Sequence, residues 1–111
     1  MISVSGVYTL VRRIVAELTH VEVYQVKGRS NKEVEAKWLF ANTVYTLFYK
    51  TNVLENLTKP YLYEISYQLG YNCNDSITYL MRYYKPSEEL KELGEQLIKF
   101  CISKIKQIKK E

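Results

Sequence analysis

Apolar residues recur at intervals of three and four along most of the chain, which is the period of helices with one buried face. The first such stretch spans residues 3–19 and has two arginines and a glutamate opposite its apolar side. Residues 32–50 are apolar around much of the circumference, as is typical of the central helix of a core. The last stretch, 88–109, has an apolar stripe formed by Leu90, Leu93, Leu97, Cys101, Ile105 and Ile108.

Two shorter helices are predicted on either side of Gly70. Thr58 is the expected N-cap of the first, with Pro60 in its first turn, where a missing N–H costs nothing. Gly70 stands where a helix often ends in a left-handed residue. The buried stripe of this helix is predicted to be Leu62, Ile65, Ser66 and Leu69.

The second short helix follows a turn at residues 72–74. Asn74 or Asp75 is expected to cap it, and it runs through Tyr84 with Ile77, Leu80 and Met81 facing inward. Two helices of similar length joined by such a turn have the spacing of a helix-turn-helix. Ser87 is the predicted cap of the helix that comes next.

The predicted fold is therefore all-α. We expect a single domain over residues 1–111 with about five helices, a helix-turn-helix region within 10–84 and an added amphipathic helix at 87–110. Val21, Val23 and Val26 alternate like a strand, but no partner strand is predicted. A connector or a short helical turn fits this stretch better.

Composition agrees with a globular domain, since 47% of the residues are hydrophobic and 25% are charged. The net charge of +4 is compatible with a nucleic-acid partner without requiring one. Residues 51–85 hold three basic and three acidic side chains, so the predicted helix-turn-helix is neutral. Seven of the eleven tyrosines lie within residues 61–84. Each can serve core packing or a wet interface.

An enzyme is not predicted. The sequence has no Gly-rich phosphate loop, no HExxH and no GxSxG motif. His20 is the only histidine and is expected at a helix end, while Cys73 and Cys101 form no metal-ligand spacing. We therefore expect no catalytic residue, no metal, no cofactor and no small-molecule substrate. With no apolar run of about 20 residues, we also expect no membrane partner and a cytoplasmic location.

Polar residues at the start of the second short helix suit contact with DNA in the major groove. Asparagine pairs well with adenine, and serine and threonine adapt to several bases. The side chains that can reach base edges or phosphates are Asn72, Asn74, Asp75, Ser76 and Thr78, and of these Asn74, Ser76 and Thr78 are expected in the major groove. Lys59, Tyr61 and Arg82 are expected at phosphates, while Tyr79 and Tyr83 are as well suited to the core or a partner as to DNA.

A basic segment precedes the central helix in VKGRSNKEVEAK, residues 26–37. Basic side chains beside a helix N-terminus suit a phosphate, and a flexible arginine can enter the minor groove. Arg29 and Ser30 are therefore predicted at DNA, with Lys32 and Lys37 as clamps on its backbone. The alternative is a solvated charged face.

From about Leu10 to Tyr84 the chain resembles the C-terminal DNA-binding domain of the bacterial replication initiator DnaA. "KGR", ending at Arg29, is similar to the basic loop of that domain, and Ala36-Lys37 to its Ala-Arg pair. "YEISYQLGY" is similar to the Glu-Ile-Gly-x-x-Phe-Gly segment. The family's Arg-Asp-His-Thr-Thr-Val signature is replaced by residues 72–77, NCNDSI, in which only the last two positions are conservative.

The resemblance implies binding of double-stranded DNA at a site other than the usual initiator box. It further implies a free-standing bacterial or mobile-element relative that regulates replication or transcription. The alternative is a protein-interaction module that kept the helix-turn-helix and lost DNA. The last helix has no counterpart in the family. Its basic end, KIKQIKKE, suits a solubilising helix terminus or a second basic patch, and its Leu90–Ile108 stripe suits packing onto the domain or a homodimer seam.

Overall fold

The computed structural model describes residues 2–23, 31–71 and 74–110, and over these ranges it is helical without strands. The helices are α1 (Val4–Thr19), α2 (Asn31–Tyr45), a π-helical turn η2 (Thr46–Lys50), α3 (Leu62–Gln68), α4 (Asn74–Arg82) and α5 (Glu88–Lys110). The prediction of an all-α fold with about five helices is confirmed. The predicted central helix corresponds to α2 together with η2.

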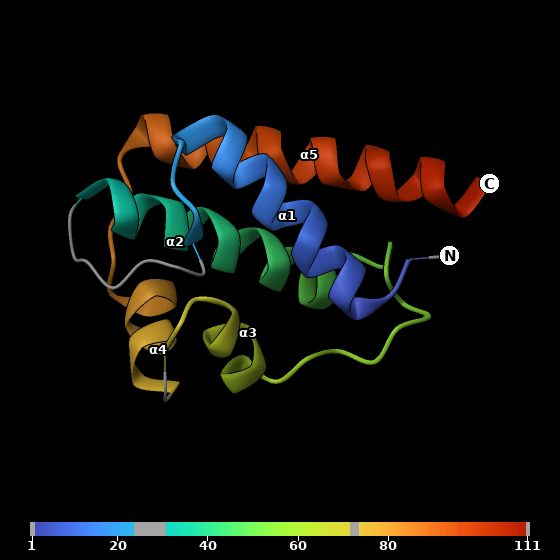
Figure 1. The fold of residues 1–111 in the computed structure, drawn as a ribbon, viewed down its shortest axis with the longest axis horizontal. Coiled ribbons are helices and arrows are strands. Elements are labelled where there is room, and N and C mark those ends of the chain that lie inside the picture. The colour runs from blue at the N-terminus through green and yellow to red at the C-terminus, as the bar shows by residue number, and fades with distance from the viewer. Residues whose placement is uncertain (1, 24–30, 72–73, 111) are drawn as a thin grey trace.

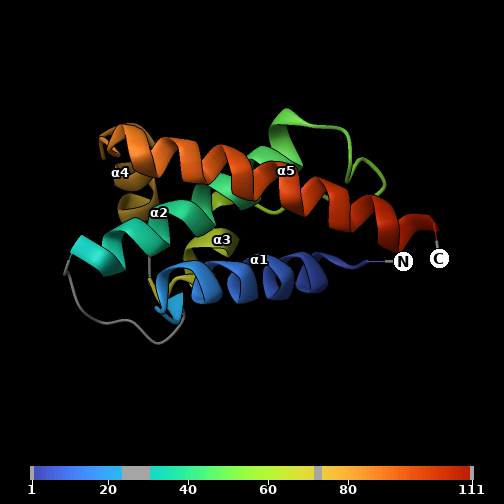
Figure 2. The same cartoon turned by 90° about the horizontal axis from the view of Figure 1, so that it is seen from above.

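Helix α2 occupies the middle of the molecule and contacts each of the other four α-helices (Figure 1). Helices α1 and α5 run beside it in opposite directions, so the two ends of the chain lie at the same end of the molecule (Figure 2). Helices α3 and α4 pack against each other and against α2 (Figure 1). This arrangement leaves one side of α4 away from the core.

Side-chain caps begin the long helices. The hydroxyl of Ser3 accepts a hydrogen bond from the N–H of Gly6 at 3.0 Å. The hydroxyl of Ser87 accepts one from the N–H of Leu90 at 3.1 Å, which confirms the predicted cap of α5. His20 ends α1 in the left-handed conformation, with φ of 60°, and is the expected helix-end histidine.

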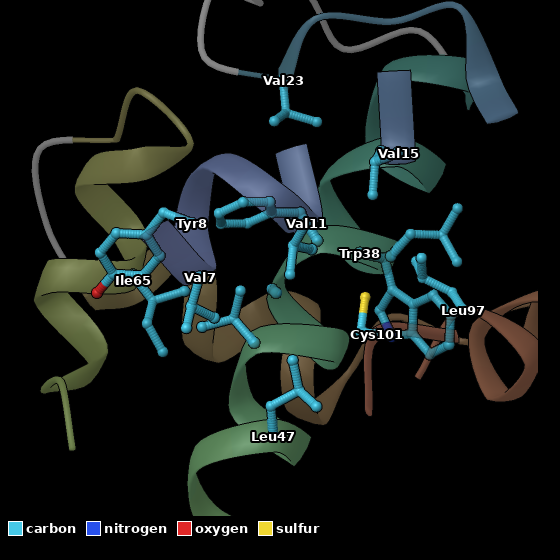
Figure 3. Packing of buried hydrophobic residues seen from close by; sticks show 14 of the residues in the cluster. Val7, Tyr8, Val11, Val15, Val23, Trp38, Leu47, Ile65, Leu97 and Cys101 are labelled. Carbon is cyan, nitrogen blue, oxygen red and sulfur yellow. The ribbon is translucent and has the colours of Figure 1, made fainter. Parts of the chain in front are cut away.

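The core gathers fully buried side chains from α1, α2 and α5 (Figure 3). The indole ring of Trp38 in α2 packs against α5 at Gly94, which has no side chain. A Cβ at this position would lie 3.2 Å from the ring. Burial raises the pKa of the Cys101 thiol to about 12. The buried residues of α5 include Leu90, Leu97, Cys101 and Ile105.

The predicted stripe of α5 is therefore used within the chain itself. Leu97, Cys101 and Ile105 are at most 2% exposed, so they offer no surface for a homodimer seam. Of the two open interpretations, packing onto the domain is the one observed. Any pairing of two copies through α5 has to use another face of this helix.

The prediction for the start of α3 was wrong. The helix begins at Leu62 after Tyr61, so Thr58 is not its cap and Pro60 precedes it. The carboxylate of Glu64 accepts the N–H of Tyr61 at 2.7 Å, and the hydroxyl of Tyr49 donates to the carbonyl of Pro60 at 2.5 Å. These contacts hold the chain extended before the helix. Leu62, predicted to be buried, is the first residue of the helix and is 36% exposed.

Candidate nucleic-acid interface

Helices α3 and α4 are joined through a tight turn at Gly70. Gly70 has φ of 81°, which confirms the predicted left-handed residue after the first helix. Its N–H donates to the carbonyl of Tyr67 at 3.0 Å, and the N–H of Tyr71 donates to Ser66 at 3.2 Å. These bonds close α3 and turn the chain toward α4.

The residues just before and just after α4 are anchored on α2. On the N-terminal side, the ammonium of Lys37 lies 4.4 Å from the centre of the Tyr71 ring. On the C-terminal side, the rings of Tyr84 and Trp38 are 6.5 Å apart. Ile77 and Leu80 are buried between these anchors. Helix α4 is thus held against the core along its inner side.

The opposite side of α4 is exposed and carries Arg82, an expected phosphate contact, together with two tyrosines for which the sequence left the role open. Tyr79 is 57% exposed and Tyr83 66% exposed, and Arg82 is exposed as well. Ser76 and Thr78 are half-buried. Residues two apart in a helix are separated by about 200° around its axis, so Ser76 and Thr78 lie on opposite flanks of α4.

The missed signal was the position of Tyr79 relative to the buried pair. Ile77 and Leu80 define the inner side of α4, and at the helical period Tyr79 and Arg82 both fall on the outer side. The abundance of tyrosine in this segment left its function open at the sequence level. Asn74 is the first residue of α4. Its side chain is not among those that the structure describes, and Arg29, Ser30 and Asn72 lie outside the described residues.

Three basic side chains are exposed near the C-terminal end of α4. Arg82 and Lys85 belong to that end, and Lys32 stands in the first turn of α2. Burial raises the pKa of the Tyr84 hydroxyl, and the negative charge of Glu35 is the second cause. Lys32 lies about one turn along α2 from Glu35. The part of α2 that contains Glu35 and Trp38 therefore lies near Tyr84, which follows α4.

Lys37 does not belong to this exposed group, and its predicted role as a backbone clamp is not supported by its position. The residue is 4% exposed, and its ammonium packs over the ring of Tyr71. Burial lowers the pKa of this ammonium, partly offset by the charge of Glu33. The sequence pattern could not show this, because the ring that covers Lys37 belongs to Tyr71, 34 residues further along the chain.

The segment before α3 carries a second pair of predicted contacts. Lys59 is exposed, with its ammonium 5.3 Å from the centre of the Tyr49 ring. Tyr61 is 66% exposed and stacks on Tyr63 at 5.7 Å between ring centres. Tyr63 in turn meets Tyr67 edge to face. A row of exposed tyrosines therefore begins at the start of α3.

Among the described side chains, no group of three His, Cys, Asp or Glu residues is arranged to hold a metal ion. None of the described helices combines the length and apolar character required to cross a membrane. The surface around α4 is thus built from aromatic rings, hydroxyl groups and a few cations.

Comparison of the chain with protein-family models, with curated proteins and with solved structures finds no match in any of the three. The resemblance to the DNA-binding domain of DnaA therefore stays a prediction, based on the residues quoted above.

Proposed function

We propose that this protein binds double-stranded DNA through α4, as a diverged and free-standing relative of the initiator domain. The observation that supports this best is the fixed position of α4, anchored on α2 before and after the helix while its outer side stays exposed. A helix that enters the major groove has to be held rigidly and to project from the surface.

In the proposed complex, the exposed cations contact the DNA backbone. Arg82 and Lys85 follow the C-terminal end of α4, and Lys32 reaches a phosphate from the adjacent turn of α2. Arg29 joins them as the sequence-based candidate for the minor groove. Tyr79 lies at the centre of the outer side, where its ring contacts base edges and its hydroxyl donates a hydrogen bond.

Specificity in this complex comes from few contacts, and most of the affinity comes from phosphates. Helix α4 has one arginine, Arg82, and one acidic residue, Asp75, so its own charge adds little. Binding carried by few phosphate contacts is modest and falls with rising salt. The recognised sequence is expected to differ from the initiator box because the signature at residues 72–77 differs.

Fluorescence anisotropy with labelled duplexes of random sequence tests the proposal. We expect Arg82→Ala and Lys32→Ala to weaken binding uniformly across sequences, and each to lower the salt slope by about 1. Lys99→Ala is the matched control, since it removes the same charge from an exposed position on α5 outside the basic end at residues 104–111. Absence of duplex binding by the unmodified chain at low salt would contradict the proposal, as would equal losses for all three variants.

A second candidate function is a protein-interaction surface, which the tyrosines favour. Tyr61 and Tyr67 on the α3 side and Tyr79 and Tyr83 on the α4 side are each more than half exposed. Tyrosine is enriched at interfaces because its ring is apolar and its hydroxyl remains wet. If this function holds, the chain does not bind duplex DNA at low salt, and the substitutions Arg29→Ala and Lys32→Ala leave the anisotropy of the labelled duplexes unchanged.

A further inference from the structure

An apolar groove lies between the C-terminal half of α1 and the middle of α5. Its volume is about 320 Å³, and it is lined by Ile14, Glu17, Leu18, Leu93, Gln96, Leu97 and Phe100. Leu18 is 46% exposed and Phe100 49% exposed. Large apolar side chains gathered in one exposed groove indicate a contact surface.

This groove differs from the stripe of α5 that packs into the core. Phe100 and Leu93 are one heptad apart and lie on one flank of the helix, beside the buried Leu97. Leu18 and Ile14 of α1 form the facing wall. Helix α5 therefore has a second apolar strip, which α1 covers only in part.

The charges of α5 are sorted along its length. Residues 88–96 hold four glutamates and one lysine, and residues 97–110 hold five lysines and no acidic residue. The helix macrodipole favours such an order only within the first and last turns. Lys104 lies before the last turn and on the same side of the helix as Leu93 and Phe100, so the macrodipole does not account for its position.

We propose that this groove binds a second copy of the same chain, with the two α5 helices antiparallel about a two-fold axis between Gln96 and Leu97. Glu89 in the acidic half of each helix then faces Lys104 in the basic half of its partner, a contact that the two-fold interface makes twice. The pairing is a property of α5 and does not depend on DNA binding.

The spacing along α5 assigns the opposing residues. Leu93 and Phe100 are equally far from the axis, about 5 Å at 1.5 Å per residue, so each meets the other on the partner. Glu89 and Lys104 are also equidistant, about 11 Å from the axis, and both are exposed. Lys104 already lies over Phe100, with its ammonium 5.5 Å from the ring centre. The basic group therefore borders the apolar strip.

Sedimentation velocity of the full chain without DNA tests the pairing, over a range of protein concentrations at low salt. We expect a monomer–dimer equilibrium in the unmodified protein. Glu89→Lys and Lys104→Glu each convert two attractions into two repulsions, and each should weaken dimerisation by about tenfold or more. Phe100→Ser should weaken it as well, through lost apolar contact. Thermal unfolding checks that each variant is folded.

Mixing the two charge variants makes the test specific to this register. A Glu89→Lys chain and a Lys104→Glu chain carry complementary charges at both contacts, so the mixture should regain dimers that neither variant forms alone. Glu95→Lys is the control, because it changes the same charge about 200° around the helix from Leu93. A monomer at every concentration, equal weakening by the control, or a mixture without dimers would each overturn the proposal.

Discussion

Tyr8 shows how burial of a single hydroxyl sets the response to alkaline pH. It lies in the core at 8% exposure (Figure 3). Burial, followed by the nearby charges of Glu64 and Tyr49, raises its pKa from 10.0 to about 12. Since the neutral form is favoured in the folded state, this stabilisation is complete below pH 10 and is lost as the pH rises from 10 to 12.

Tyr8→Phe is therefore expected to remove part of the alkaline loss of stability. The pKa difference corresponds to roughly 2–3 kcal/mol in the free energy of unfolding at high pH. Urea unfolding of both proteins at pH 8 and near pH 12 measures the difference. The variant should lose less stability between these values. Equal losses in the two proteins would show that Tyr8 ionises as easily in the folded state.

Gly70 presents a backbone requirement of a different kind. Its φ of 81° lies in the left-handed region, where a side chain costs about 1–2 kcal/mol. Gly70→Ala should lower the free energy of unfolding by about that amount, and Gly70→Asn by less, because asparagine tolerates this conformation. His20→Gly should act in the opposite direction, since His20 has φ of 60°. Chemical denaturation of the three variants compares them.

At the scale of elements, the sequence predicted those helices whose apolar period is long and whose caps are local. The span of α5 followed from Ser87 and an apolar stripe, and the span of α2 with η2 from a wide apolar face. The start of α3 could not be predicted in this way. It depends on the hydrogen bond from Tyr49 to Pro60, which joins residues eleven apart.

The candidate site was predictable only in part for the same reason. Gly70 and the exposure of Arg82 followed from local pattern, whereas the burial of Lys37 results from the turn before α4 folding over it. Tyr79 lies on the outer side of α4 because Ile77 and Leu80 of the same helix pack into the core. Tertiary packing, rather than composition, decided which polar residues remain at the surface.

The contact of α5 with α2 leads to a prediction about packing. Gly94→Val should destabilise the protein by about 1–3 kcal/mol, because the new side chain meets the ring of Trp38. A double-mutant cycle with Trp38→Leu isolates this contact. In the Trp38→Leu background the cost of Gly94→Val should fall, since the ring no longer occupies the space. An unchanged cost would locate the strain elsewhere.

At the scale of the whole molecule, the two proposed surfaces bind different partners, DNA at α4 and a second copy of the chain at the groove. Helix α4 lies across α2 from α1 and α5 (Figure 1). DNA at α4 and a second copy at the groove therefore need not compete. In such a dimer the two α4 helices would face outward on opposite sides, so each would contact a duplex of its own.

Pairing through the groove also makes thermal stability depend on protein concentration. Because a dimer stabilises the folded state by mass action, the Tm of the unmodified chain should rise by a few degrees for each tenfold increase in concentration. Phe100→Ser should have a Tm that is independent of concentration, and Glu95→Lys should behave like the unmodified chain. Differential scanning calorimetry at several concentrations measures this. A Tm that stays constant in the unmodified chain, at concentrations where sedimentation detects dimers, would mean that the dimer dissociates at a temperature below that of unfolding.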